Sequence, residues 1–185
     1  MYYLGLDIGS SSVKAGLIDA ASGKSLHSVH EPKNEMGIVS VKDEWAEQDP
    51  NDWWLHTCKA IQRVCRESNS DPKKIISIGI SYQMHGLVLV DNKGSVLRNS
   101  IIWCDSRAVE IGNKAFSEIG EEKCMKHLLN SPGNFTASKL KWVKDNEPDI
   151  YQNIYKYMLP GDFIAFKLSG DINTTCNGLS EGILW

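Results

Sequence analysis

The stretch that decides the fold is LGLDIGSSSVKAGLID, residues 4–19. It consists of two apolar runs, each with the length of a β-strand, on either side of one glycine and three serines. Residues 2–7 are predicted as a buried strand and Val13–Asp19 as a second strand. The short connection predicts an antiparallel hairpin. The one charged residue of the first run, Asp7, therefore lies where the strand meets the turn.

The turn has the composition of a phosphate-binding loop. Gly9 lets a ligand approach the backbone closely, and several backbone N–H groups are exposed together in such a turn. Asp7 would repel a phosphate by itself, but it fits if Mg²⁺ bridges the carboxylate to a nucleotide phosphate, directly or through water. The hydroxyl donors and the nearby cation complete a predicted metal–nucleotide site of Asp7, Gly9, Ser10, Ser11, Ser12 and Lys14.

An ordinary hairpin remains the alternative for the same residues. Glycine and serine would then satisfy only the geometry of the turn, and Asp7 would be a plain strand-end residue. The chain has neither a G-x-x-x-x-G-K-[ST] loop nor a G-x-G-x-x-G fingerprint. Short motifs of this kind are hypotheses that need a structural context.

The rest of the chain predicts a mixed α/β domain. Leu26–His30 continues the hairpin into a meander, and Asp49-Pro50 marks the start of a long helix. Residues 75–82, IISIGISY, are predicted as a central strand covered on both faces. Further strands are expected at 87–91, 100–105 and 155–160, and helices at 107–130, 137–146 and 161–170. The last nine residues resemble a strand that is cut short, which suggests a longer protein. The expected architecture is a mixed sheet of about five strands flanked by helices.

Composition narrows the class of protein. The chain has 185 residues, 42% of them hydrophobic, and a net charge of −3 without a basic patch, so nucleic acid is not an expected partner. The five cysteines form no C-x-x-C pair, which predicts free thiols rather than a zinc site or a disulfide framework. No signal peptide and no membrane-length apolar run is evident, so a cytoplasmic protein without a membrane partner is expected.

Six stretches in sequence order resemble one family. The first resembles the first phosphate loop of the actin-like ATPase superfamily, and the others resemble the FGGY carbohydrate kinases, most of all the xylulose kinases. They are GLDIGSSSVKAGLID (5–19), EWAEQDPNDWW (44–54), GISYQMHGLVLVD (79–91), SIIWCDSRA (100–108), NFTASKLKWVKDNEPDIY (134–151) and YMLPGDFIAFKLSGD (157–171). One departure is Asn134, where the family pattern has a small or apolar residue.

The resemblance implies a ribonuclease H-like fold of the actin-like ATPase type. Residues 1–185 would be the N-terminal, sugar-binding domain of a two-domain kinase that uses ATP and Mg²⁺. The C-terminal domain, absent from this chain, would supply the aspartate that acts as general base and most of the adenine pocket. A homodimer is left open.

The resemblance also implies a sugar site. Met84 and His85 would contact the ketose, with Gln83 in the same loop, while Trp103 and Asp105 would line the pocket. A loop that directly follows a buried strand is a common place for a ligand in α/β proteins. The residues alone allow other roles: His85 as a surface histidine, Trp103 as core, and Asp105 as a helix cap.

The predicted function is phosphorylation of a ketopentose by ATP, with D-xylulose converted to D-xylulose 5-phosphate. This chain alone is expected to be inactive. One alternative is another kinase of the family, acting on ribulose, gluconate, glycerol or a deoxy-sugar. A second is a non-enzymatic actin-like ATPase domain, and a third is a free-standing sugar-binding module.

Overall fold

The computed structural model describes residues 1–184, which divide into two compact units. The first unit contains residues 1–37 and 51–83, and the second contains residues 38–50 and everything from residue 84 onward. The prediction for the last nine residues falls partly on residue 185, which lies outside the described residues.

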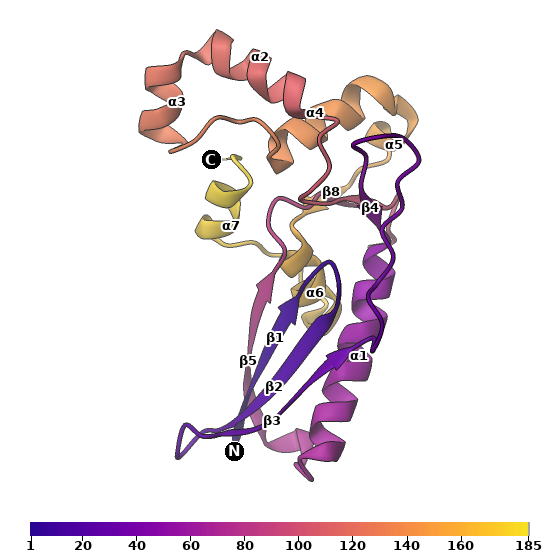
Figure 1. Cartoon of the computed structure of the whole chain (residues 1–185), viewed down its shortest axis with the longest axis vertical. Coiled ribbons are helices and arrows are strands. Elements are labelled where there is room, and N and C mark those ends of the chain that lie inside the picture. The colour runs from indigo at the N-terminus through magenta and orange to yellow at the C-terminus, as the bar shows by residue number, and fades with distance from the viewer. Residues whose placement is uncertain (185) are drawn as a thin grey trace. The chain divides into compact units, whose positions relative to one another are not determined.

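The first unit is built on a four-stranded mixed sheet with the order β3-β2-β1-β5 (Figure 1). β1 (Tyr2–Ile8), β2 (Val13–Asp19) and β3 (Ser25–Glu31) form the predicted antiparallel meander. β5 (Ile75–Tyr82) runs parallel to β1. The mixed sheet is therefore confirmed, although it has four strands rather than about five.

One face of this sheet is buried under helix α1 (Pro50–Glu67), which begins at the predicted Asp49-Pro50 signal. Alternate side chains of β1 and β2 point to that face, so Leu4, Leu6 and Ile8 are buried. Arg63 of α1 contacts Glu31 of β3 at 2.9 Å, which ties the helix to the sheet. A short 3-10 helix, η1 (Pro72–Lys74), then leads into β5. The helix side of the buried layer consists of Trp53, Thr57, Ala60 and Val64.

The prediction that residues 75–82 are covered on both faces is wrong. β5 is the edge strand of the sheet, and no residue in it is fully buried. Ile76 is 51% exposed and Ile78 is 40% exposed. An uncharged, β-branched run is typical of a central strand, but the position in the sheet decides the burial.

The second unit contains two short antiparallel ladders. β4 (Glu47–Gln48) pairs with β7 (Ser100–Ile101), and β6 (Val88–Val90) pairs with β8 (Lys156–Met158). The described part of this unit also contains six helices: α2 (Val109–Ile119), α3 (Glu121–His127), α4 (Thr136–Asn146), α5 (Pro148–Gln152), α6 (Pro160–Ser169) and α7 (Cys176–Glu181). The strands and helices predicted between residues 87 and 170 are thus present, with the single helix at 107–130 divided at Gly120, whose φ is +94°.

The core of the second unit joins the ladders to α4. Leu87, Leu89, Ile101 and Val143 are buried together, and Trp142 packs against them. The strand predicted for residues 177–185 is wrong, because residues 176–181 form helix α7. Among the described residues, no helix is both long and apolar enough to cross a membrane.

Candidate functional site

The loop between β1 and β2 in the first unit is the candidate phosphate site. The N–H of Gly9 donates to the carbonyl of Ser12 at 3.1 Å, which closes the turn. The carbonyl of Ser11 accepts from the N–H of Met36 at 2.8 Å. Two carbonyl oxygens that would repel a phosphate are thus engaged by backbone donors. A Cβ at Gly9 would stand 3.0 Å from the Ser12 carbonyl oxygen, so the tight turn favours glycine there.

Asp7 and Lys14 face each other across the hairpin. They are register partners on β1 and β2, and Lys14 Nζ lies 3.0 Å from Asp7 Oδ2. Both side chains are accessible, at 45% exposed for Asp7 and 64% for Lys14. The hairpin therefore brings together the carboxylate, the cation and the glycine–serine turn that the sequence predicts as one site.

The single carboxylate of Asp7 could hold Mg²⁺ only together with phosphate and water ligands. Mg²⁺ is usually held by one or two carboxylates together with substrate phosphates and water, rather than by a full protein cage. Residues 1–184 contain no group of three or more acidic, histidine or cysteine side chains that could hold a metal ion by themselves. A single accessible carboxylate beside a phosphate loop matches the first arrangement.

In the second unit, the loop after β5 carries His85 in a left-handed conformation with φ +59°. Its backbone is held at both ends. Glu181 of α7 accepts from the His85 N–H in a short hydrogen bond, and Lys139 Nζ of α4 donates to the His85 carbonyl at 2.7 Å. Next to it, a Cβ on Gly86 would come within 2.5 Å of Pro160 Cγ, so the loop packs tightly against the start of α6.

The His85 ring faces a cavity of about 370 Å³. The ring lies 4.1 Å from the ring of Phe135, centroid to centroid, and its Nδ1 lies 2.9 Å from Glu181 Oε1. Asn177 and Ser180 of α7 add polar groups to the lining. The aliphatic side chains of Leu128, Leu129 and Ile183 complete the lining. A cavity that combines apolar side chains with an imidazole and several hydrogen-bonding groups can hold a small ligand with hydroxyl groups.

The other residues predicted for the sugar site lie in different surroundings. Met84 is 55% exposed and Trp103 is 47% exposed, which rules out the core alternative for Trp103. Gln83 is buried, and its N–H donates to the carbonyl of Ile8 at 2.8 Å. Asn134, the departure from the family pattern, donates to the Trp103 carbonyl at 3.0 Å.

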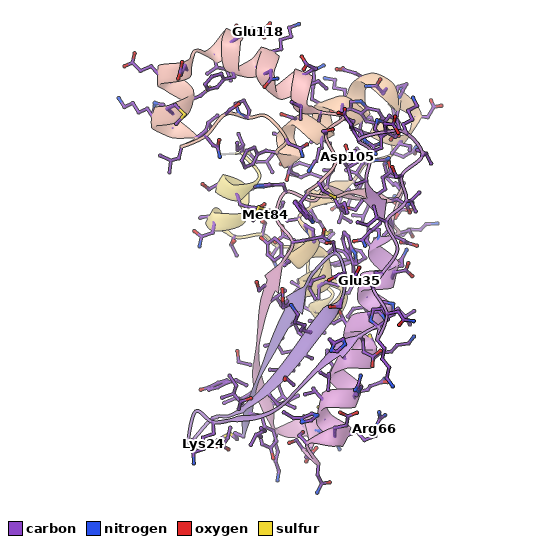
Figure 2. The ribbon with its side chains drawn as sticks, viewed as in Figure 1. Lys24, Glu35, Arg66, Met84, Asp105 and Glu118 are labelled. Carbon is purple, nitrogen blue, oxygen red and sulfur yellow. The ribbon has the colours of Figure 1, made fainter. Side chains whose placement is uncertain are left out.

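Asp105 lies at the centre of a buried charge cluster. Its carboxylate accepts from the backbone N–H of Ala46 at 2.6 Å and from the Arg107 guanidinium, whose side chain is 1% exposed. That guanidinium also contacts Glu47 at 2.7 Å and stacks on Trp45 at 3.8 Å. The cluster ties β4 to the segment after β7, and Glu47 has a structural role in it. Figure 2 labels Asp105 and Met84 among the side chains of this unit.

Sequence reasoning missed two residues that shape the His85 site. Glu181 follows His85 by 96 residues, in a segment whose apolar pattern predicts a strand. Lys139 lies within residues 134–151, a stretch that resembles the family but does not by itself indicate a role for this lysine. It is fully buried, and burial lowers the pKa of its amine to about 8, against the opposing effect of the nearby Asp105 carboxylate. Neither contact has a local sequence signal.

Comparison with solved structures shows which class of protein has this fold. The candidate phosphate loop and the His85 cavity occur in a fold shared with solved sugar kinases. A Brucella ovis enzyme described as a "xyloylose kinase" is similar with a TM-score of 0.83 and 35% identity, over 92% of this chain and 35% of its own. A gluconate kinase from Lactobacillus acidophilus is similar with a TM-score of 0.86 and 25% identity, over 98% of this chain and 36% of its own.

The family follows from the sequence. Residues 2–183 match the FGGY family of carbohydrate kinases, N-terminal domain, and the chain belongs to this family. A curated relative, the xylulose kinase of Bacillus subtilis, is 34% identical over 178 residues, which are 94% of this chain. The chain spans about a third of the length of the curated relatives it matches. The expected actin-like ATPase fold is confirmed.

Proposed function

We propose that this chain is the N-terminal domain of an ATP-dependent kinase that phosphorylates a ketopentose, with D-xylulose giving D-xylulose 5-phosphate. The observation that carries the proposal is the built His85 cavity, in a chain whose curated relatives are xylulose kinases over nearly its whole length. The general base and most of the adenine pocket would come from a C-terminal domain.

Each unit of the chain would have its own task. Phosphoryl transfer requires mainly positioning and charge neutralisation. Asp7 would hold Mg²⁺, which neutralises phosphate charge when bound. Gly9, whose N–H closes the turn, would let a phosphate approach the backbone closely, the three serines would donate to phosphate oxygens, and Lys14 would add a positive charge. The ion pair between Asp7 and Lys14 supports this assignment, because it places a carboxylate and a cation together beside the turn.

The second unit would hold the sugar. His85 would bind hydroxyl groups, with Met84 next to it and with Gln83, the last residue of the first unit, in the same loop. Trp103 would offer its accessible ring to the carbon face of the sugar. Asp105 is proposed to line the pocket as well, although its oxygens already accept from Ala46 and Arg107. We also expect the protein to act in the cytoplasm, and the five free cysteines are compatible with a reducing compartment.

A different sugar is the alternative that a specific observation favours. The similarity to a gluconate kinase, at 25% identity over 98% of this chain, shows that the same fold accommodates a sugar acid in that protein. Pocket residues, rather than the fold, would then select the substrate.

A coupled ADP-release assay on the whole protein that contains this chain tests the proposal. It compares D-xylulose, D-ribulose, L-ribulose, gluconate and glycerol, with and without Mg²⁺. We expect Mg²⁺-dependent release that is strongest with D-xylulose. Stronger release with another sugar would overturn the substrate, and no sugar-dependent release would overturn the kinase.

A further inference from the structure

Two ionised side chains hold the backbone of His85. Its N–H donates to the Glu181 carboxylate, and its carbonyl accepts from the Lys139 ammonium at 2.7 Å. Hydrogen bonds to charged groups are about twice as strong as neutral ones. They act here on a residue at φ +59°, a left-handed conformation that is unfavourable for residues other than glycine. The pair of contacts offsets the cost of the left-handed conformation.

The same carboxylate also faces the imidazole. Glu181 Oε1 lies 2.9 Å from Nδ1, at an angle that makes the contact electrostatic rather than a well-aligned hydrogen bond. A negative charge at Nδ1 favours a proton on that nitrogen. In the neutral ring, Nε2 is then an acceptor, which can receive a hydrogen bond from a hydroxyl group.

The surroundings restrict the ring from other directions. Phe135, at the start of α4, lies 4.1 Å away, centroid to centroid. Lys139, three residues into α4, is fully buried and holds the carbonyl. Glu181 is the last residue of α7, and Thr175 caps the start of that short helix by accepting from the Gly178 N–H at 3.0 Å. Two helices therefore determine where one imidazole lies.

We propose that Glu181 is a positioning residue for sugar binding: it holds His85 in the left-handed conformation and keeps the ring proton on Nδ1, so that Nε2 accepts from a hydroxyl group of the sugar. This inference rests on the proposed function for the identity of the ligand. Lys139 holds the other side of the same peptide unit.

Kinetics of the whole protein give the first test. Glu181→Ala removes the acceptor and the charge, and we expect the KM for D-xylulose to rise about tenfold while the KM for ATP changes by less than about twofold. Glu181→Gln keeps an oxygen that can accept from the His85 N–H, so the KM should rise by only about two- to fourfold. Glu122→Gln, on the exposed surface of α3, is the matched control and should behave as wild type.

The ring nitrogens of His85 give a second readout that needs no turnover. In whole protein with ¹⁵N-labelled histidine, assigned with a His85→Asn variant, NMR should show Nδ1 protonated in wild type. The pattern should shift toward Nε2 protonation in Glu181→Gln. If circular dichroism shows that Glu181→Ala does not fold, Glu181→Gln alone provides the test.

Unchanged sugar KM in the Glu181 variants, or unchanged ¹⁵N shifts in Glu181→Gln, would overturn the inference. Absence of sugar-dependent ADP release in wild type would instead overturn the proposed function. The NMR result would then still decide whether Glu181 sets the state of His85.

Discussion

Lys139 is a fully buried charged residue of the second unit. Its side chain is fully buried in α4, where it donates to the His85 carbonyl. Burial lowers the pKa of the amine from 10.5 to about 8, while the Asp105 and Glu181 carboxylates act in the opposite direction. The amine is thus protonated at neutral pH, when its three donors are most useful, but at a cost in stability.

The lowered pKa of Lys139 predicts that the free energy of unfolding depends on pH. Between about pH 8 and 10.5 the unfolded chain binds a proton at Lys139 and the folded chain does not, so the free energy of unfolding should rise with pH in that window. The rise should approach about 3–4 kcal/mol, since a pKa difference of one is worth about 1.4 kcal/mol. Urea denaturation of wild type and Lys139→Met across this window measures it.

The difference between the two proteins isolates the effect, because all other titrating groups are shared. We expect wild type to gain stability relative to Lys139→Met as the pH rises, on top of a constant offset from the lost hydrogen bond. A difference that stays flat from pH 7 to 10.5 would show that the amine has an ordinary pKa.

At the same scale, local chemistry could be predicted where a short turn connects the residues. Asp7, Gly9 and Lys14 lie within one hairpin, so their proximity follows from the register of β1 and β2. The contacts of His85 with Lys139 and Glu181 could not be predicted, because they depend on how α4 and α7 return to one loop. Their roles in catalysis and binding remain predictions.

At the scale of elements, α2 packs closely against the loop before α4 because residue 112 is a glycine. A Cβ on Gly112 would lie 2.3 Å from the Gly133 carbonyl oxygen and 2.5 Å from its Cα, both of them backbone atoms. Backbone cannot rotate away as a flexible side chain can, so glycine permits the close approach of the two segments.

Gly112→Ala should therefore lower the free energy of unfolding by about 1–3 kcal/mol, despite the better helix propensity of alanine. Gly79→Ala is the control, because a Cβ there would meet nothing within 4 Å and β5 is a strand. Thermal unfolding followed by circular dichroism compares them. Equal melting temperatures for the two variants would contradict the predicted close packing.

Elements were predictable where the signal is local. The meander, the start of α1 and the glycine end of α6 follow from alternation, from Asp49-Pro50 and from Gly170, which adopts φ +82°. Burial of β5 was not predictable, because whether a strand is central or at the edge depends on which strands pair with it. The short helix α7 was missed because its six residues include only one large apolar side chain, Leu179.

At the scale of the whole molecule, the chain is about a third of the length of its curated relatives. It has a candidate phosphate loop in one unit and a candidate sugar cavity in the other. In the proposed division of labour, a general base from a C-terminal domain completes the reaction, and closure around both substrates limits ATP hydrolysis.

Residues 1–185 alone should then lack sugar-dependent ADP release, because no general base is assigned to them, although weak sugar binding is expected. A coupled assay of this fragment beside the whole protein, with folding checked by circular dichroism, compares the two. Robust turnover by the fragment would refute the proposed division of labour.

The central claim is that the two units serve different substrates, and steady-state kinetics of two variants of the whole protein test it most directly. His85→Asn should raise the KM for D-xylulose by about tenfold or more with the KM for ATP nearly unchanged. Asp7→Asn should lower kcat by roughly a hundredfold or more, and raise the Mg²⁺ concentration needed for activity, with the sugar KM nearly unchanged. If both variants changed the same constants to the same extent, or if neither reduced activity, the assignment of the phosphate loop and the sugar cavity would be contradicted.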